Sequence, residues 1–304
     1  MLQEQRIGID GVYTYDKVQV AIDRLRAFEA LALEYSPEGY YLCDSGGKDS
    51  SVIKELAIMS GVKHGVHHNH TTLDHPETVY FVRHEKARYE AMGIPYTIHY
   101  PKMSFPQLMR KKKMPPTRLK RYCCEVLKEQ GGEGCVCVTG VRWSESVKRA
   151  QQRGVAEVLA PKRENKIILN NDNDEARKEF ESCQIKGKRV VNPIIDWTDD
   201  DVWEFIGMRR LVVNPLYAMG YKRVGCVGCP MNPREAAAQM EANPKYKANW
   251  LRWFGHLIED AERDARQITF ATADDWLACW LGGKLPKDDG QISFDDEEEE
   301  DDGI

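Results

Sequence analysis

At 304 residues, the chain is long enough for one large α/β domain, or for one such domain with a helical annex. Its mean hydropathy of -0.57, the lack of a long apolar run and the lack of an apolar segment after the first residues argue against a membrane span and a secretory signal, so we expect a cytoplasmic protein. The formal net charge of -5 comes from an unbroken acidic run at 295–302, without which the chain is mildly basic.

The elements are predicted in chain order from apolar spacing. A helix is expected at 16–34, and short apolar strands follow at 40–43, 62–67, 94–100, 135–141 and 190–191. Helices at 50–60 and 76–92 separate the first three strands, and the pattern from 199 to 281 is mostly helical. This alternation predicts an α/β fold, with a parallel twisted sheet covered by helices on both faces and a helical C-terminal region.

Four segments follow from this pattern. They are an N-terminal helical segment at 1–38, an α/β domain at 39–232, a helical C-terminal region at 233–286 and an acidic disordered tail at 287–304. A run of like charge usually stays solvated, so the tail is expected to aid solubility, with a docking arm for a basic partner as the alternative.

A glycine-rich turn directly follows the strand at 40–43 and precedes a helix. Glycines let the backbone approach a phosphate, a helix start adds positive potential, Lys48 adds a full charge, and Asp49 is explained if it holds a hydrated Mg²⁺. The spacing is not that of a Walker A loop, and an ordinary strand-to-helix turn is the alternative. The residues expected at the phosphates are Ser45, Gly46, Gly47, Lys48, Asp49, Ser50 and Ser51.

This turn resembles the PP-loop of the ATP pyrophosphatases, and further motifs from 40 to 229 occur in the order seen in the phosphoadenosine-phosphosulfate (PAPS) reductase family of the adenine nucleotide α-hydrolase superfamily. The motifs are His70-Thr71-Thr72-Leu73-Asp74-His75, Arg121-Tyr122-Cys123-Cys124, Gly140-Val141-Arg142-Trp143-Ser144-Glu145-Ser146 with Arg149, Asn192-Pro193-Ile194-Ile195-Asp196-Trp197, and Gly225-Cys226-Val227-Gly228-Cys229. The pattern is most similar to the ATP pyrophosphatases of DNA phosphorothioation and to the iron–sulfur adenylyl-sulfate reductases.

The resemblance implies an enzyme that binds ATP with Mg²⁺ and cleaves it to AMP and pyrophosphate, adenylating an acceptor for sulfur transfer. Thr71, Thr72 and Asp74 would assist at the nucleotide, and Arg142 and Arg149, with Lys48 and Asp49, would act on the phosphates or on a sulfate. For the two arginines, a surface ion-pair cluster is the alternative.

Sulfonucleotide reductases of this family carry a nucleophilic cysteine near the C-terminus, and they usually replace the Ser-Gly-Gly-Lys-Asp-Ser loop. This sequence lacks the first feature and keeps the loop, which favours ATP cleavage. A thioredoxin-dependent PAPS or adenylyl-sulfate reductase is the alternative enzyme. A non-catalytic protein that senses nucleotide or redox state is the alternative from another class.

Nine cysteines in a cytoplasmic chain are not expected to form disulfides. Cys123, Cys124, Cys226 and Cys229 form two close pairs that could hold an iron–sulfur cluster or zinc, with unligated thiols as a third option. The resemblance implies a 4Fe–4S cluster. The remaining cysteines are interpreted as structural, apart from Cys183, which is ambiguous; the structural set is Cys43, Cys135, Cys137 and Cys279.

The sequence is compatible with several kinds of binding partner. A sulfur donor protein (a cysteine desulfurase or a thioredoxin-like protein), a nucleic-acid acceptor and a homo-oligomer all fit, whereas a membrane does not. The basic stretch at 110–113, continued by Arg118, Lys120 and Arg121, is equally compatible with a solvated helix face and with a polyanionic substrate. A histidine-rich stretch at 64–75 straddles a strand end, so a metal site there is disfavoured.

Overall fold

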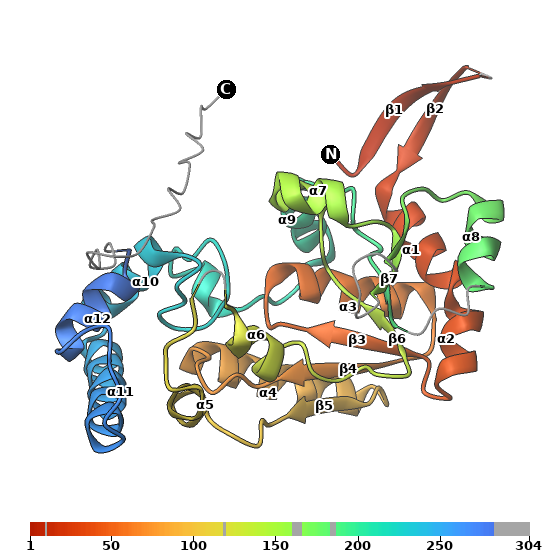
Figure 1. Ribbon diagram of the computed structural model, residues 1–304. Coiled ribbons are helices and arrows are strands. Elements are labelled where there is room, and N and C mark those ends of the chain that lie inside the picture. The colour runs from red at the N-terminus through yellow and green to blue at the C-terminus, as the bar shows by residue number, and fades with distance from the viewer. Residues whose placement is uncertain (10, 118–119, 160–165, 183–186, 283–304) are drawn as a thin grey trace. The chain divides into compact units, whose positions relative to one another are not determined.

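The structure is a computed structural model that describes residues 1–9, 11–117, 120–159, 166–182 and 187–282 (Figure 1). The chain divides into two compact units, one made of 1–105 and 121–226, the other of 106–120 and 227–304. The sequence did not predict that 106–120 joins the C-terminal region. Cys183, Arg118 and the acidic tail lie outside the described residues.

Within the described residues, the first unit contains a seven-stranded sheet with the order β5-β4-β3-β6-β9-β7-β8. The expected strands are present and parallel. Their bounds are β3 Tyr40–Asp44, β4 His64–Asn69, β5 Tyr96–His99, β6 Val136–Val138 and β9 Lys188–Val191.

The parallel strands continue into two antiparallel strands that the sequence did not predict, so the sheet as a whole is mixed. Strand β7 (Ala156–Leu159) pairs antiparallel with both β9 and β8 (Ile167–Leu169). Strands of three or four residues give too few positions for an alternating pattern to be detected, so neither was predicted.

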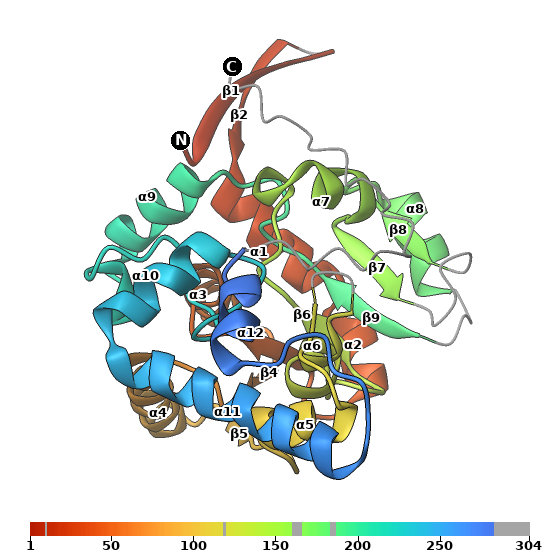
Figure 2. The same cartoon turned by 60° about the vertical axis from the view of Figure 1, so that its left-hand side comes forward.

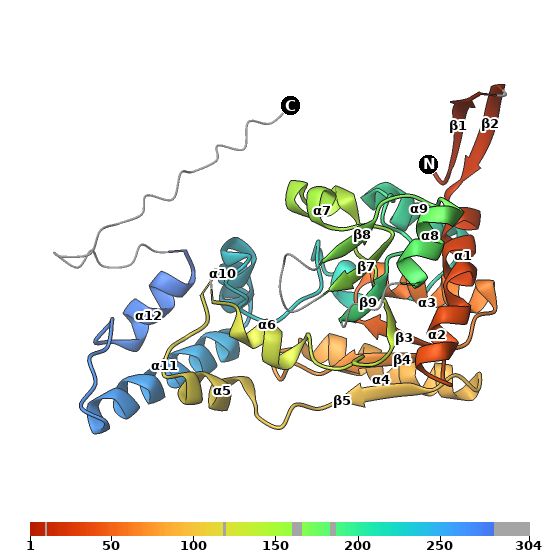
Figure 3. The same cartoon turned by 45° about the vertical axis from the view of Figure 1, so that its right-hand side comes forward.

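Helices pack on both sides of this sheet, as expected (Figures 2 and 3). The predicted helix at 16–34 is interrupted at Phe28, and the helix after the glycine-rich turn ends at Gly61 in the left-handed conformation. The helices of the first unit are α1 Lys17–Ala27, α2 Glu29–Tyr35, α3 Lys48–Ser60, α4 Pro76–Ala91, α6 Tyr122–Leu127, α7 Val147–Gln152, α8 Asp174–Glu181 and α9 Asp199–Arg209, with 3-10 turns η1 Trp143–Glu145 and η3 Pro215–Tyr217.

An unpredicted hairpin precedes α1. Strands β1 (Gln3–Gly8) and β2 (Gly11–Asp16) pair antiparallel, and Asp16 then caps α1 by accepting from the Val18 and Gln19 amides (Figure 3). The strands are exposed on both faces for most of their length, so they carry no alternation of apolar and polar residues from which the sequence could have indicated them.

A buried ion-pair network fixes the end of β3. Asp44 accepts from Lys54 Nζ at 2.7 Å and from the Tyr96 hydroxyl at 2.5 Å, and Lys54 also lies 3.0 Å from Glu85. Burial raises the pKa of Asp44, but the Lys54 charge and these hydrogen bonds outweigh it and hold the pKa well below its usual value. Asp44 is therefore an ionised anchor directly before the glycine-rich turn.

The second unit is helical, as the sequence predicted for its C-terminal part. Trp250 and Trp280 pack with ring centroids 4.8 Å apart, and Arg110 makes a bidentate ion pair with Asp260. In the part of the chain that the structure describes, no helix combines the length and apolar character needed to cross a membrane. The helices are α5 Phe105–Lys112, α10 Pro233–Ala242, α11 Pro244–Arg263 and α12 Ala273–Trp280.

Candidate active site

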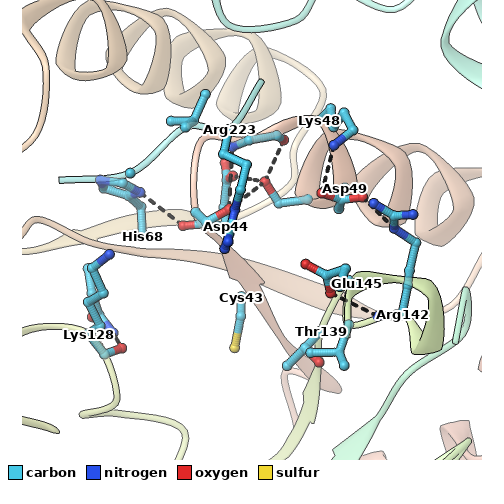
Figure 4. Close-up of a pocket in the computed structure, with 18 of the residues that line it drawn as sticks. Cys43, Asp44, Lys48, Asp49, His68, Lys128, Thr139, Arg142, Glu145 and Arg223 are labelled. Atoms are coloured by element: carbon cyan, nitrogen blue, oxygen red, sulfur yellow. Dashed lines mark hydrogen bonds and ion pairs between the residues drawn. The ribbon is translucent and has the colours of Figure 1, made fainter. Parts of the chain in front are cut away.

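A cleft of about 670 Å³ opens in the first unit beyond the carboxyl end of β3 (Figure 4). The glycine-rich turn, the segment after β4 and the segment after β6 all line it, as expected where parallel strands end together. Among the described residues, seven basic ones line it, together with the acidic Asp44, Asp49, Asp74, Glu145 and Asp199. The basic residues are Lys48, Lys128, Arg142, Arg149, Lys188, Lys222 and Arg223.

Asp44 stabilises the turn through hydrogen bonds. Its Oδ1 accepts from the Gly46 amide at 2.7 Å and from the Ser50 hydroxyl at 2.8 Å. Gly46 has a φ of 72°, and a Cβ there would lie 3.0 Å from Thr78 Cγ2, so both conformation and space require glycine. Asn214 Nδ2 donates to the Gly46 carbonyl at 3.1 Å from the other side. Hydrogen bonds from two other parts of the first unit therefore hold the loop in this conformation.

The serine hydroxyls expected to bind phosphate form hydrogen bonds within the loop. Ser50 and Ser51 both donate to the Gly47 carbonyl, at 2.8 and 3.2 Å, and Ser45 Oγ accepts from the Gly47 amide. Ser45, Gly47 and Ser50 line the cleft, as do Lys48 and Asp49, whereas Gly46 and Ser51 support the loop from outside the lining.

Four charged side chains meet at the start of α3. Arg142 Nε lies 2.8 Å from Asp49 Oδ1, and its Nη2 lies 2.9 Å from Asp199 Oδ1. Lys48 Nζ lies 2.9 Å from the same Asp199 oxygen. Arg142 is only 3% exposed, so its guanidinium is held in place. Although burial raises the pKa of Asp199, Lys48 and Arg142 outweigh that effect and lower it. We call Lys48, Asp49, Arg142 and Asp199 the charge cluster.

Sequence reasoning missed Asp199 and Tyr217. Asp199 begins α9 within an acidic triplet that looks like ordinary helix capping. The Tyr217 hydroxyl accepts from the Lys48 amide at 2.8 Å, and burial raises its pKa to about 12, so it is neutral. It occupies an amide at the helix start, where a phosphate oxygen could replace it. No local pattern around Tyr217 indicated this role.

Arg149 forms its ion pair with Glu145. Its pKa is lowered, first by burial and then by the neighbouring charges of Arg223 and Arg153. Arg142 and Arg149 both line the cleft but contact different partners, and their expected action on the phosphates or on a sulfate stays a prediction. Positive charges gathered around Arg149 form a region that favours an anion.

The predicted nucleotide contacts after β4 divide into two groups. Thr71 donates through its amide and its hydroxyl to the Asp74 carboxylate, at 2.7 and 2.8 Å, and both residues line the cleft. Thr72 does not line it. Its φ is 62°, and its hydroxyl accepts from the Phe105 amide at 2.8 Å.

The cysteine pairs are distributed over both units. Cys123 and Cys124 begin α6. The hydrogen bond from Cys123 is the largest cause that lowers the pKa of Cys124 to about 5, with burial opposing it and Arg121 supporting it. The Cys226 thiol donates to Thr71 Oγ1 at 3.5 Å, whereas Cys229 belongs to the second unit. Among the residues that can be described, no group of three or more His, Cys, Asp or Glu side chains is assembled that could hold a metal ion.

Comparison with known proteins identifies the family. Residues 40–232 match the sequence model of the phosphoadenosine phosphosulfate reductase domain. An adenosine 5'-phosphosulfate reductase of Burkholderia cepacia is 30% identical over 116 residues, 36% of either chain. The enzyme of the same name from Mycobacterium tuberculosis is 47% identical over 47 residues, 16% of this chain and 18% of its own. The matches thus span about a third or less of these curated relatives.

Longer but weaker likenesses also occur. An uncharacterized protein of Methanocaldococcus jannaschii is 27% identical over 225 residues, 68% of this chain and 48% of its own. The PAPS reductase of Candida auris, solved with phosphate, aligns with a TM-score of 0.44 at 21% identity over 68% of this chain and 87% of its own. The U34-tRNA thiolase NcsA of Methanococcus maripaludis, solved with its [4Fe-4S] cluster, aligns with a TM-score of 0.42 at 12% identity over 83% and 80%.

The family match covers the sheet, the glycine-rich turn, the charge cluster and all four cysteines of the two close pairs. It therefore includes every residue that lines the cleft. The chain belongs to the phosphoadenosine phosphosulfate reductase domain family.

Proposed function

We propose that this protein binds Mg-ATP at the glycine-rich turn and cleaves it between the α and β phosphates, adenylating an acceptor for sulfur transfer. The charge cluster carries this proposal, because it presents two carboxylates and two cations together at the start of α3. A magnesium-bound triphosphate carries negative charge for the two cations and a metal ion for the two carboxylates. Its phosphates suit Lys48 and Arg142, and its hydrated cation suits carboxylate oxygens.

A sulfonucleotide without a metal ion is a poorer match to the same cluster. It would draw Lys48 and Arg142 away from Asp49 and Asp199 and leave both carboxylates next to added negative charge. Like charges that close disfavour binding, whereas Mg²⁺ brought in with the nucleotide removes the conflict. The arrangement therefore supports ATP over PAPS as the ligand of the turn.

In the proposed reaction, an acceptor atom attacks the α-phosphorus, the bond to the bridging oxygen breaks, and pyrophosphate leaves. Lys48 and Arg142 would neutralise the charge that develops on the leaving group, and the amides at the start of α3 would orient its oxygens. Asp44 keeps the turn in place through Gly46 and Ser50. The protein would act mainly by positioning and electrostatics. Asp49, with Asp199, would hold the Mg²⁺ that travels with the substrate.

A resident 4Fe–4S cluster on Cys123, Cys124, Cys226 and Cys229 remains a proposal, supported by the sequence pattern. The described residues do not gather a metal-binding group, so we derive no step through it. Such a cluster would supply redox chemistry or hold the loops that carry it. Anaerobic purification followed by iron, sulfide and zinc analysis tests it. Iron at about four atoms per chain is expected, and stoichiometric zinc or no metal would contradict the cluster.

The basic lining of the cleft supports a polyanionic acceptor, and we propose a nucleic acid, with a cysteine desulfurase or thioredoxin-like protein supplying the sulfur. A reductase of adenylyl sulfate or PAPS is the second candidate, favoured by the names of the curated relatives.

Calorimetric titration separates the two candidates. Mg-ATP, ATP with a chelator, adenylyl sulfate and PAPS are titrated in parallel, and sulfite is measured after addition of thioredoxin. We expect Mg-ATP to bind at least about tenfold more tightly than the two sulfonucleotides, a difference of about 1.4 kcal/mol, with no sulfite released. Tighter sulfonucleotide binding together with sulfite would instead establish the reductase.

A further inference from the structure

Strand β3 presents two different faces. Tyr40 and Leu42 point into the main hydrophobic core. Tyr41 and Cys43 alternate with them and therefore face the other side of the sheet. There, Tyr41, Cys137 and Val190 form a separate small cluster, against which Cys43 packs. Both Tyr41 and Cys43 line the cleft, so the cleft extends from the glycine-rich turn over this face of the sheet.

The thiol of Cys43 has a distinctive environment. Strand register pairs Tyr41 with Cys137, which places Cys137 on the same face one step from Cys43. The neighbouring Cys137 is the largest influence on the pKa of the Cys43 thiol and lowers it against the opposing effect of burial, with the Lys188 charge acting in the same direction. Lys188 also lines the cleft and donates to the Gly131 carbonyl at 2.9 Å.

The backbone leaves room for this thiol pair. Gly132 has a φ of 69°, and a Cβ there would lie 2.4 Å from Cys137 Sγ. The Cys137 thiol in turn donates to the Gly132 carbonyl at 3.6 Å. In Figure 4 the Cys43 sulfur extends away from the side of β3 on which Lys48 and Asp49 lie. The thiol is thus in the nucleotide cleft without taking part in the charge cluster.

We propose that Cys43 is a nucleophilic residue of this cleft that accepts a sulfane sulfur atom from a donor persulfide, and that Cys137 positions it. This inference rests on the proposed sulfur-transfer function and names the residue that carries the sulfur. The Cys43 thiolate attacks the outer sulfur of the donor, the donor's S–S bond breaks, the donor leaves as a thiolate, and Cys43 becomes a persulfide. No external oxidant or reductant is needed, because the sulfur is exchanged between two thiolates.

The location explains why a sulfur carrier would be useful there. The cleft's volume lies within the range of about 300–1,000 Å³ typical of ligand sites, so an activated acceptor at the turn and a persulfide on Cys43 share one enclosure. Holding both reactants in one site makes their encounter effectively unimolecular.

The test exposes the full chain to glutathione persulfide, traps thiols with an alkylating agent, and measures the modification of each cysteine by peptide mass spectrometry. Cys279 is the internal reference, because burial raises its pKa. We expect Cys43 to be persulfidated at least about tenfold faster than Cys279, since the thiolate is the attacking species. Equal rates at Cys43 and Cys279 would overturn the assignment.

Two substitutions at Cys137 test the positioning role. Cys137→Ser retains a hydrogen-bond donor and should keep the preference for Cys43, whereas Cys137→Val should remove most of it. Loss of the preference in both variants, or in neither, would contradict that role. Circular dichroism confirms that each variant is folded, and Cys279→Ser serves as a matched control that leaves labelling of Cys43 unchanged.

The same samples distinguish this inference from the proposed function. Labelling of Cys43 without any AMP or pyrophosphate from ATP would keep the reactive thiol and reject ATP cleavage. ATP cleavage with an inert Cys43 would reject the thiol and keep the proposed function.

Discussion

The Arg142 guanidinium lies 2.8 Å from the Asp49 carboxylate and joins the segment after β6 to the first turn of α3. The two segments touch closely here. A Cβ on Gly140 would lie within 3.1 Å of the Asp49 backbone. The ion pair is therefore fixed by the fold, and in our account it is the contact that a bound magnesium nucleotide would rearrange.

Arg142→Lys should weaken Mg-ATP binding, although charge is conserved. A lysine has one compact ammonium and cannot reach Asp49, Asp199 and Ser144 at once as the guanidinium does. We expect a loss of about tenfold to a hundredfold in affinity, or about 1.4–2.8 kcal/mol, measured by calorimetric titration. Unchanged affinity in this variant would show that the guanidinium geometry is irrelevant to the nucleotide.

Asp199→Asn should make nucleotide binding less dependent on Mg²⁺. The carboxylate now contacts Lys48 and Arg142, and in our account a magnesium ion would replace them as its partner. Binding of ATP is measured across a series of Mg²⁺ concentrations, with Asp200→Asn, in the same acidic triplet and exposed, as the control. Equal shifts in both variants would mean that Asp199 acts only through net charge.

Lys54→Met should destabilise the first unit strongly. The ammonium is fully buried between Asp44 and Glu85, and its removal leaves two buried carboxylates without their shared partner. We expect a loss of about 3–5 kcal/mol in the free energy of unfolding. Arg209→Met, which removes an exposed ion pair with Glu55, should cost no more than about 1 kcal/mol. Denaturant unfolding compares them, and similar losses would refute the role of burial.

Stability should fall as pH drops through the range set by His67. Burial, followed by the neighbouring His99, lowers the pKa of His67 from 6.5 to about 4. Between these values the unfolded chain binds the proton and the folded chain does not, so acid favours unfolding in this window. His67→Phe should flatten the decline in unfolding free energy between about pH 6.5 and 4 relative to His84→Phe at an exposed position. An identical slope in both variants would contradict this.

Much of the sheet could be predicted because its strands are short apolar runs between turns, as at 40–43 and 62–67. The antiparallel β7 and β8 and the exposed hairpin at β1 and β2 could not, since neither length nor apolar alternation marks them. We expected parallel pairing throughout because the predicted strands alternate with helices. The two short antiparallel strands β7 and β8 do not change that alternation, so the sequence pattern cannot reveal them.

The site was predicted only as far as local motifs reach. Lys48, Asp49 and Arg142 could be predicted as candidate site residues because each belongs to a recognisable segment. Asp199 and Tyr217 were missed because their roles depend on contacts with Lys48, more than 150 residues earlier. In the structure, the Ser51 hydroxyl donates to a backbone carbonyl and the Thr72 hydroxyl accepts from a backbone amide. From the sequence alone, such backbone hydrogen bonds cannot be distinguished from contacts to a ligand.

The central claim is that the turn directs cleavage of ATP between its α and β phosphates. Its most direct test follows α-labelled ATP with Mg²⁺ in the presence of water alone, of short DNA or of short RNA. We expect labelled AMP and one pyrophosphate per AMP, and we expect neither product in the Lys48→Ala, Asp49→Ala double variant. Labelled ADP with phosphate, or AMP formation that survives in the double variant, would contradict it.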